Sequence, residues 1–190
     1  MKSVFRPAII LFAALTLICC VVYPYLVTGI GQAAFPGKAN GSIVMRGGQP
    51  VGSSLIGQAF TSPKYFWGRP SATSPKPNDA TASGGSNLSP ANPAQVDAVK
   101  GRVEALKAAD PENKAPIPVD LVTASGSGLD PEISLAGAYY QVPRIARERK
   151  LSEDRVRNLI DEKKELRSIG FFGEPRVNVL ALNLALDSMH

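Results

Sequence analysis

The residue types that most often carry enzyme chemistry are nearly absent from this chain. Its two cysteines, Cys19 and Cys20, lie inside an apolar stretch, and its single histidine is the last residue, His190. Histidine and cysteine supply most zinc ligands and many nucleophile–base pairs. No lysine has a serine three residues before it, which is the spacing of the penicillin-binding hydrolases. These scarcities argue against a metal centre and against Cys–His, Ser–His–Asp and Ser–Lys catalysis.

Two segments keep a weaker chemical signal. Consecutive backbone amides in a glycine turn can bind an anion, and one such turn comprises Ser83, Gly84, Gly85, Ser86 and Asn87. A tight turn capped by the asparagine is the plainer interpretation, because no helix start with a lysine follows. Asp120 and Asp130 flank a second glycine turn, where capping of the turn explains them better than paired-carboxylate catalysis does.

The net charge is too small to indicate a nucleic-acid partner. The chain has 21 Lys and Arg against 16 Asp and Glu, a balance of +5. Two of the basic residues precede the apolar stretch, so the remainder carries only +3. Nucleic-acid binding usually needs a dense basic face, and an ordinary solvated surface is the better interpretation.

Residues 8–28 form an uncharged apolar segment that is long enough to cross a bilayer. These 21 residues would extend roughly 31 Å as a helix, against a hydrocarbon core of about 30 Å. A helix satisfies its own backbone hydrogen bonds, which lipid cannot do. We therefore expect a transmembrane helix, with Tyr23 and Tyr25 near the outer interface and Pro24 bending or ending the helix there.

The basic residues indicate which way the helix is inserted. Lys2 and Arg6 lie in the short tail 1–7, whereas the first basic residue on the other side is Lys38. The positive-inside tendency favours a cytoplasmic N-terminus, with residues 29–190 outside the cytoplasm. Two alternatives are weaker: a cleaved signal peptide usually has an apolar core of only about 7–15 residues, and a lipoprotein site at Cys20 would need a small residue before it.

The first half of the exported part is rich in turn signals. Residues 29–41 are expected to be an exit loop, and Gly47-Gly48 predicts a hairpin between two strands within residues 42–58. Residues 61–93 contain six prolines and many small polar residues, which predicts a long irregular loop. Aromatic residues at 65–67 are unusual for a disordered linker, so we expect the loop to be ordered and functional.

The second half combines helices and strands. Asn92-Pro93 opens a helix that ends near Asp110, and further helices are expected at 134–141, from Pro143 and from Ser152. Strands are expected at 118–123 and 175–180, the latter leading into residues 183–189. The predicted fold class is α+β, with one N-terminal transmembrane helix followed by a single mixed α/β extracytoplasmic domain at 29–190.

The chain resembles a known family along nearly its whole length. The motifs that carry the resemblance lie at 6–8 (RPA), 22–24 (VYP), 40–42 (NGS), 52–58 (GSSLIGQ), 65–72 (YFWGRPSA), 82–88 (ASGGSNL), 118–129 (PVDLVTASGSGL), 141–144 (QVPR) and 177–187 (VNVLALNLALD). Each motif alone is weak, but their number, order and spacing together are specific. They resemble the C subunit, or KdpC family, of the bacterial high-affinity Kdp potassium-transporting ATPase.

The resemblance implies a non-catalytic accessory subunit of an ATP-driven potassium uptake complex. In that family a channel-like subunit binds potassium, a P-type ATPase subunit hydrolyses ATP, and the C subunit assembles and stabilises the complex. The family has also been described as raising the affinity of the ATPase subunit for ATP. No cofactor is expected on this chain alone, and ATP only in complex with the ATPase subunit. The candidate nucleotide contacts are then Ser83–Asn87 together with Gln141 and Arg144.

The remaining candidate residues concern partner binding. Trp, Tyr and Arg dominate interface hot spots, so the predicted partner interface comprises Tyr65, Phe66, Trp67 and Arg69, with Tyr23 and Pro24 in the anchor. The anchor would also contact membrane lipid. A different interpretation, in which the three rings cover their own domain's core, stays open. The alternative function classes are a membrane-anchored exported hydrolase and a ligand-binding module.

Overall fold

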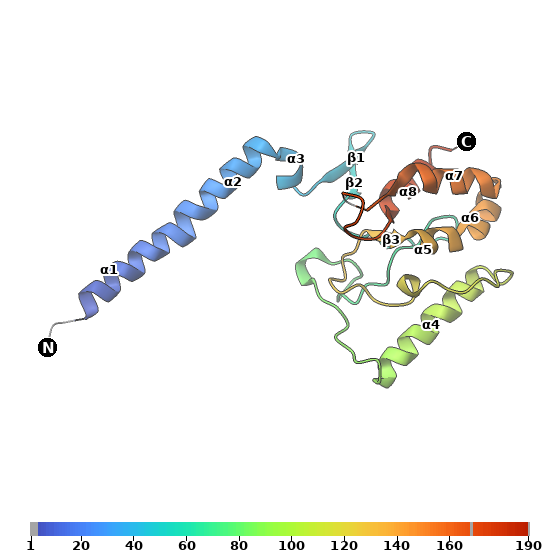
Figure 1. Ribbon diagram of the computed structural model, residues 1–190, viewed down its shortest axis with the longest axis horizontal. Helices are drawn as coiled ribbons and strands as arrows, with labels where there is room; N and C mark the ends of the chain where they lie inside the picture. The colour runs from blue at the N-terminus through green and yellow to red at the C-terminus, as the bar shows by residue number, and fades with distance from the viewer. Residues whose placement is uncertain (1–3, 168, 190) are drawn as a thin grey trace. The chain divides into compact units, whose positions relative to one another are not determined.

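The computed structural model describes residues 4–167 and 169–189 (Figure 1). The first three residues of the expected tail 1–7, and His190, therefore lie outside the described residues. The chain divides into two compact units, residues 1–44 and residues 45–190. Each unit is described separately below.

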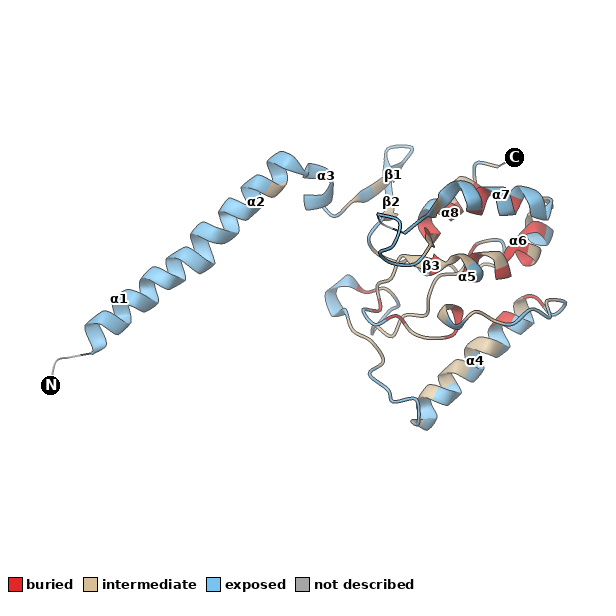
Figure 2. Cartoon of the chain, viewed as in Figure 1, coloured by how far each residue is buried: buried red, intermediate tan, exposed pale blue. Residues whose placement is uncertain are grey.

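The first unit is dominated by one continuous apolar helix. It comprises α1 (Phe5–Thr16), the π-helical turn η1 (Leu17–Val22) and α2 (Tyr23–Ala34). It has 30 residues, its most apolar 18-residue window has a mean hydropathy of 2.4, and no residue of that window is buried. At 1.5 Å per residue the helix extends about 45 Å, so by length and composition it can cross a membrane. Figure 2 shows it in the colour of exposed residues along almost its whole length.

Pro24 does not end this helix, contrary to one of the two expectations for it. The backbone N–H of Tyr23 donates to the carbonyl of Ile18, five residues back, which is the wide π-type spacing. A proline inside a helix lacks a donor and clashes with the carbonyl four residues earlier. The wider turn directly before Pro24 gives its ring room, so the helix continues to Ala34.

The expected exit loop at 29–41 is also largely helical. Residues 29–34 belong to α2, and α3 (Pro36–Ala39) follows directly. The predicted hairpin is confirmed as β1 (Ile43–Arg46) and β2 (Gln49–Ser53). Gly47 and Gly48 connect the strands with φ of 58° and 80°. Two successive positive φ angles suit the twist of a tight hairpin, and glycine adopts them without steric cost.

The long irregular loop is confirmed, since η2 (Ala80–Ala82) is the one helical turn between β2 and residue 92. Helix α4 (Pro93–Ala109) begins as expected, with the Asn92 side chain accepting from the N–H of Ala94. In Figure 1 it lies across the unit from α7 and α8. The segment expected as a strand at 118–123 is instead the 3₁₀ turn η3 (Val119–Leu121).

A small antiparallel sheet and four helices form the rest of the second unit. The sheet has the order β3–β5–β4, from β3 (Glu132–Ser134), β5 (Arg176–Asn178) and β4 (Lys164–Glu165). The helices are α5 (Leu135–Tyr140), α6 (Val142–Arg149), α7 (Glu153–Lys163) and α8 (Val179–Leu186). Strand β5 is shorter than the predicted 175–180, because Asn178 caps α8 by accepting from the N–H of Ala181.

The core lies between these helices and the sheet. Helix α7 contacts α5, α6, α8 and β5, and Figure 2 shows the buried residues gathered in the same elements. Fully buried apolar side chains include Val142, Ile145, Val156, Ile160 and Leu182. Phe66, from the long loop, joins the same cluster. The mixed helix and sheet architecture, with one apolar N-terminal helix, confirms the predicted α+β class. The contribution of Phe66 to the core explains why the proline-rich loop is ordered.

Candidate partner interface

Two buried amide side chains bind the backbone of residues 65–67, which we call the aromatic loop. Asn183 of α8 accepts from the N–H of Phe66 at 2.8 Å and donates to its carbonyl at 3.0 Å. Gln141 does the same for Trp67, at 2.8 and 3.1 Å. Both amides are almost completely buried. Each amide side chain therefore pairs with both backbone groups of one loop residue, as a neighbouring strand would. These backbone groups thus keep their hydrogen-bond partners.

The guanidinium of Arg144 binds the same loop. Its Nη1 donates to the carbonyls of Pro63 and Tyr65, and its Nη2 donates to Gln141 at 2.6 Å. The guanidinium carbon lies 4.5 Å from the centre of the Trp67 ring. Burial lowers the pKa of Arg144 to about 10, which still leaves the side chain charged at neutral pH. The loop backbone thus supplies the hydrogen-bond acceptors that a buried guanidinium needs.

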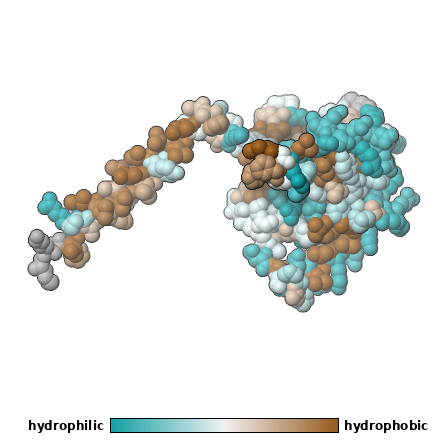
Figure 3. Space-filling model, viewed as in Figure 1, coloured by the Kyte–Doolittle hydropathy of each residue, from teal (hydrophilic) through white to brown (hydrophobic). Residues whose placement is uncertain are grey.

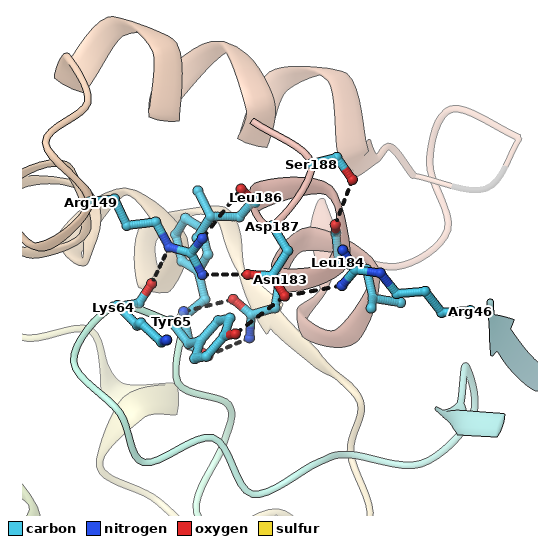
Figure 4. Close-up of polar contacts among 10 residues, drawn as sticks. Arg46, Lys64, Tyr65, Arg149, Asn183, Leu184, Leu186, Asp187 and Ser188 are labelled. Atoms are coloured by element: carbon cyan, nitrogen blue, oxygen red, sulfur yellow. Dashed lines mark hydrogen bonds and ion pairs between the residues drawn. The ribbon is translucent and has the colours of Figure 1, made fainter. Parts of the chain in front are cut away.

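Asp187, just beyond α8, connects the loop to the first hairpin (Figure 4). Its carboxylate accepts from Arg149 at 2.7 Å, from Arg46 at 3.1 Å and from the hydroxyl of Tyr65 at 3.2 Å. Burial raises the pKa of Asp187, but the hydrogen bonds from Arg149, Arg46 and Tyr65 outweigh it and lower the pKa below its usual value. Arg149 also donates to the carbonyl of Lys64 and lies over the Tyr65 ring.

These contacts separate the predicted interface residues into two groups. Phe66 is fully buried in its own core, so its ring has the alternative role foreseen from the sequence. Tyr65, Trp67 and Arg69 are half-buried and keep part of their surface accessible. Arg69 donates to Asp130 at 2.7 Å. In the anchor, Tyr23 and Pro24 are exposed on the apolar helix.

The two candidate nucleotide segments have separate partners. The N–H of Gly84 donates to the carbonyl of Ser127 at 2.8 Å, and so does the hydroxyl of Ser83 at 3.0 Å. A Cβ on Gly85 would lie only 2.9 Å from the carbonyl oxygen of Gly126. Ser83, Gly84 and Gly85 are thus packed against loop 125–128, whereas Ser86 is half-buried and Asn87 is exposed.

Gln141 and Arg144, by contrast, are bonded to the aromatic loop, as described above. The contacts of both candidate segments are therefore explained by packing within the domain. Among the described residues, no group of three or more His, Cys, Asp or Glu side chains could hold a metal ion.

The structure adds an exposed apolar loop that the sequence reasoning missed. Leu166, Ile169, Phe171 and Phe172 connect β4 to β5 and are 60–83 % exposed. The two phenylalanine rings lie 4.3 Å apart, and Figure 3 shows brown, hydrophobic side chains at this loop. The sequence signal for this exposed loop was the pair Phe171-Phe172 between two glycines, Gly170 and Gly173. Clustered exposed apolar side chains are typical of binding surfaces.

The fold defines the class of a single-helix membrane protein, with one helix long enough to cross a membrane and one α+β domain. A family model described as "K+-transporting ATPase, c chain" matches residues 5–188. The chain is 70% identical over 187 residues to the potassium-transporting ATPase KdpC subunit of Janthinobacterium sp. (strain Marseille), covering 98% of this chain and 99% of that relative. It is 67% identical to the same-named subunit of Herminiimonas arsenicoxydans, over the full length of both. The chain belongs to the KdpC family, which confirms the resemblance found in its motifs.

Proposed function

We propose that this chain is a non-catalytic accessory subunit that holds together the channel-like and P-type ATPase subunits of a potassium uptake complex. Family membership supports a role inside such a complex. The contacts of the candidate nucleotide residues favour a structural role for them. Any effect on ATP affinity would then act through the ATPase subunit rather than through a nucleotide held by this chain.

The observation that carries the docking role is the exposed apolar loop 166–172. Four large apolar side chains within these seven residues are exposed to solvent. Burying apolar surface stabilises an association by about 25 cal/mol per Å². Tyr65, Trp67 and Arg69 would add the aromatic and arginine anchors that dominate interface energies. The backbone of Trp67 is already fixed by Gln141 and that of the adjacent Phe66 by Asn183, so little conformational entropy is lost here when a partner binds.

The anchor would contribute a second contact, inside the bilayer. Lipid tails are as apolar as leucine, so helices associate in membranes through close packing rather than through hydrophobicity. We propose that the face around Tyr23 and Pro24 packs against partner helices, with the N-terminus in the cytoplasm and the domain outside it. Cleavage of the domain by protease added to intact spheroplasts tests this orientation, and complete protection would reject it.

Co-purification of partners with the tagged full-length chain tests the docking role. In detergent extracts, the wild-type chain is expected to retain a polytopic channel-like protein and a P-type ATPase. The double variants Phe171→Ser with Phe172→Ser, and Trp67→Ala with Arg69→Ala, should each recover less of both. Val119→Ser is the matched control, because Val119 is a similarly exposed apolar residue on η3.

The outcomes separate the candidate functions. Undiminished recovery with both double variants would remove the assigned interface. Absence of any partner from the wild-type preparation, combined with hydrolytic activity of the purified chain, would favour the anchored hydrolase instead. Binding of a small solute by the isolated chain would favour the ligand-binding module.

A further inference from the structure

A cleft of about 340 Å³ lies between α4, the turn η3 and the loop around residues 58–71. Its lining is mainly apolar, with Phe60, Trp67, Leu106 and Leu121 among the contributing side chains. Helix α4 is only loosely covered, since Leu106 is its one buried residue. Figure 3 shows hydrophobic side chains gathered where α4 lies. The helix and the loop therefore enclose an apolar space that their own side chains do not fill.

Two arginines from opposite elements line this cleft. Arg102 of α4 donates through Nη1 to the carbonyl of Val122 at 2.9 Å. None of the ion pairs found among the described residues includes Arg102. Burial lowers the pKa of Arg102. Its charge is thus partly removed from water without a carboxylate to compensate for it.

Arg69 contributes a polar atom without a partner. One end of its guanidinium pairs with Asp130, but its Nε is buried and has no hydrogen-bond partner in the described part of the chain. Buried polar groups normally have partners, and each exception requires an explanation. Arg–carboxylate pairs are strong because they combine charge with two parallel hydrogen bonds. A carboxylate that enters the cleft would meet the half-buried guanidinium of either arginine at the apolar wall.

We propose that this cleft receives a segment of a partner subunit in which an Asp or Glu side chain lies next to an apolar side chain. The carboxylate pairs with Arg102, and the apolar side chain fills the space beside Leu106 and Leu121. The volume is near the lower end of the usual range for ligand pockets, about 300–1,000 Å³, which suits a pair of side chains. The proposal rests on the proposed function, because it requires that the chain dock to another subunit.

The experiment uses the full complex purified through a tag on this chain. Arg102→Gln removes the charge and keeps most of the side chain, while Ala105→Phe fills the cleft without altering either arginine. Each is expected to reduce recovery of the partner subunits about tenfold, the effect of about 1.4 kcal/mol. Arg102→Lys should reduce it less, since lysine keeps the charge but not the planar fork. Lys100→Gln is the control, because Lys100 is exposed on the same helix and does not line the cleft.

A photo-crosslinking residue at position 105 identifies what occupies the cleft. The expected product is a partner peptide that contains an acidic residue beside an apolar one. Crosslinking to lipid alone, or to no molecule, would overturn the proposal. The proposal would also be overturned if Arg102→Gln and Ala105→Phe both recover the partner subunits as well as the wild type does. If the Phe171→Ser, Phe172→Ser variant loses its partners in the same experiment, the proposed function would still stand. Unfolding followed through Trp67 checks that each variant chain remains folded.

Discussion

Replacing Asn183 by leucine removes the amide that pairs with Phe66 while keeping a side chain of similar size. In the native chain this amide satisfies both the N–H and the carbonyl of Phe66, at 2.8 and 3.0 Å. Phe66 and Asn183 are both almost completely buried, so water cannot replace the lost partners. The substitution leaves one donor and one acceptor unsatisfied in the interior of the domain.

The cost follows from these two groups. An unsatisfied buried polar group costs about 1–3 kcal/mol, so Asn183→Leu should destabilise the domain by about 2–6 kcal/mol. A typical domain is stable by only about 5–15 kcal/mol, so the effect would be a large part of the total. Ser188→Ala is the matched control, and Figure 4 shows the Ser188 hydroxyl bonded to Leu184. Its hydroxyl donates to Leu184 at an exposed position, so the cost should be below about 0.5 kcal/mol.

Denaturant unfolding of the full-length chain in detergent measures both variants. Trp67 is the single tryptophan of the chain and lies directly next to Phe66, so its fluorescence reports release of the loop. The expected result is a large fall in the unfolding midpoint for Asn183→Leu and almost none for Ser188→Ala. If Asn183→Leu lies within about 0.5 kcal/mol of the wild type, the pairing of amide and loop backbone is not what orders this loop.

Two further predictions concern pH and backbone geometry. The pKa of Asp187 is lowered in the folded chain, so the pairing of its carboxylate stabilises the domain above about pH 4. This stabilisation is lost as the pH falls through the lowered pKa. Thermal unfolding should therefore show that Asp187→Asn is less stable than the wild type at about pH 7 and that the difference shrinks below about pH 4. An unchanged difference across that range would refute the assignment. Gly128→Ala should destabilise the domain by at least about 1 kcal/mol, because φ is +71° and a Cβ would lie 2.7 Å from the carbonyl oxygen of Gly84. Gly126→Ala, with open space around its Cβ, should have little effect, and equal midpoints for the two glycine variants would contradict this.

Local signals in the sequence were sufficient wherever neighbouring residues decide the structure. Asn92, Ser134 and Ser152 each accept a hydrogen bond from the first turn of the helix predicted to follow. The Gly47-Gly48 hairpin is confirmed for the same reason, since its turn depends on two adjacent φ angles. Where several local preferences competed, prediction failed. Residues 118–123 have β-branched residues typical of a strand but form a 3₁₀ turn, in which the N–H of Leu121 bonds to the carbonyl of Pro118.

The sequence by itself determined the anchor helix, the mixed α and β composition and the family, because hydropathy, capping and motif order are properties of short segments. Only the tertiary structure decided which side of each candidate residue faces the interior. Phe66 and Asn183 are separated by 117 positions, and no local pattern predicts that an amide on the last helix will satisfy the backbone of the aromatic loop. The same holds for the cleft beside Arg102, which exists because α4 and the loop come together without filling the space between them.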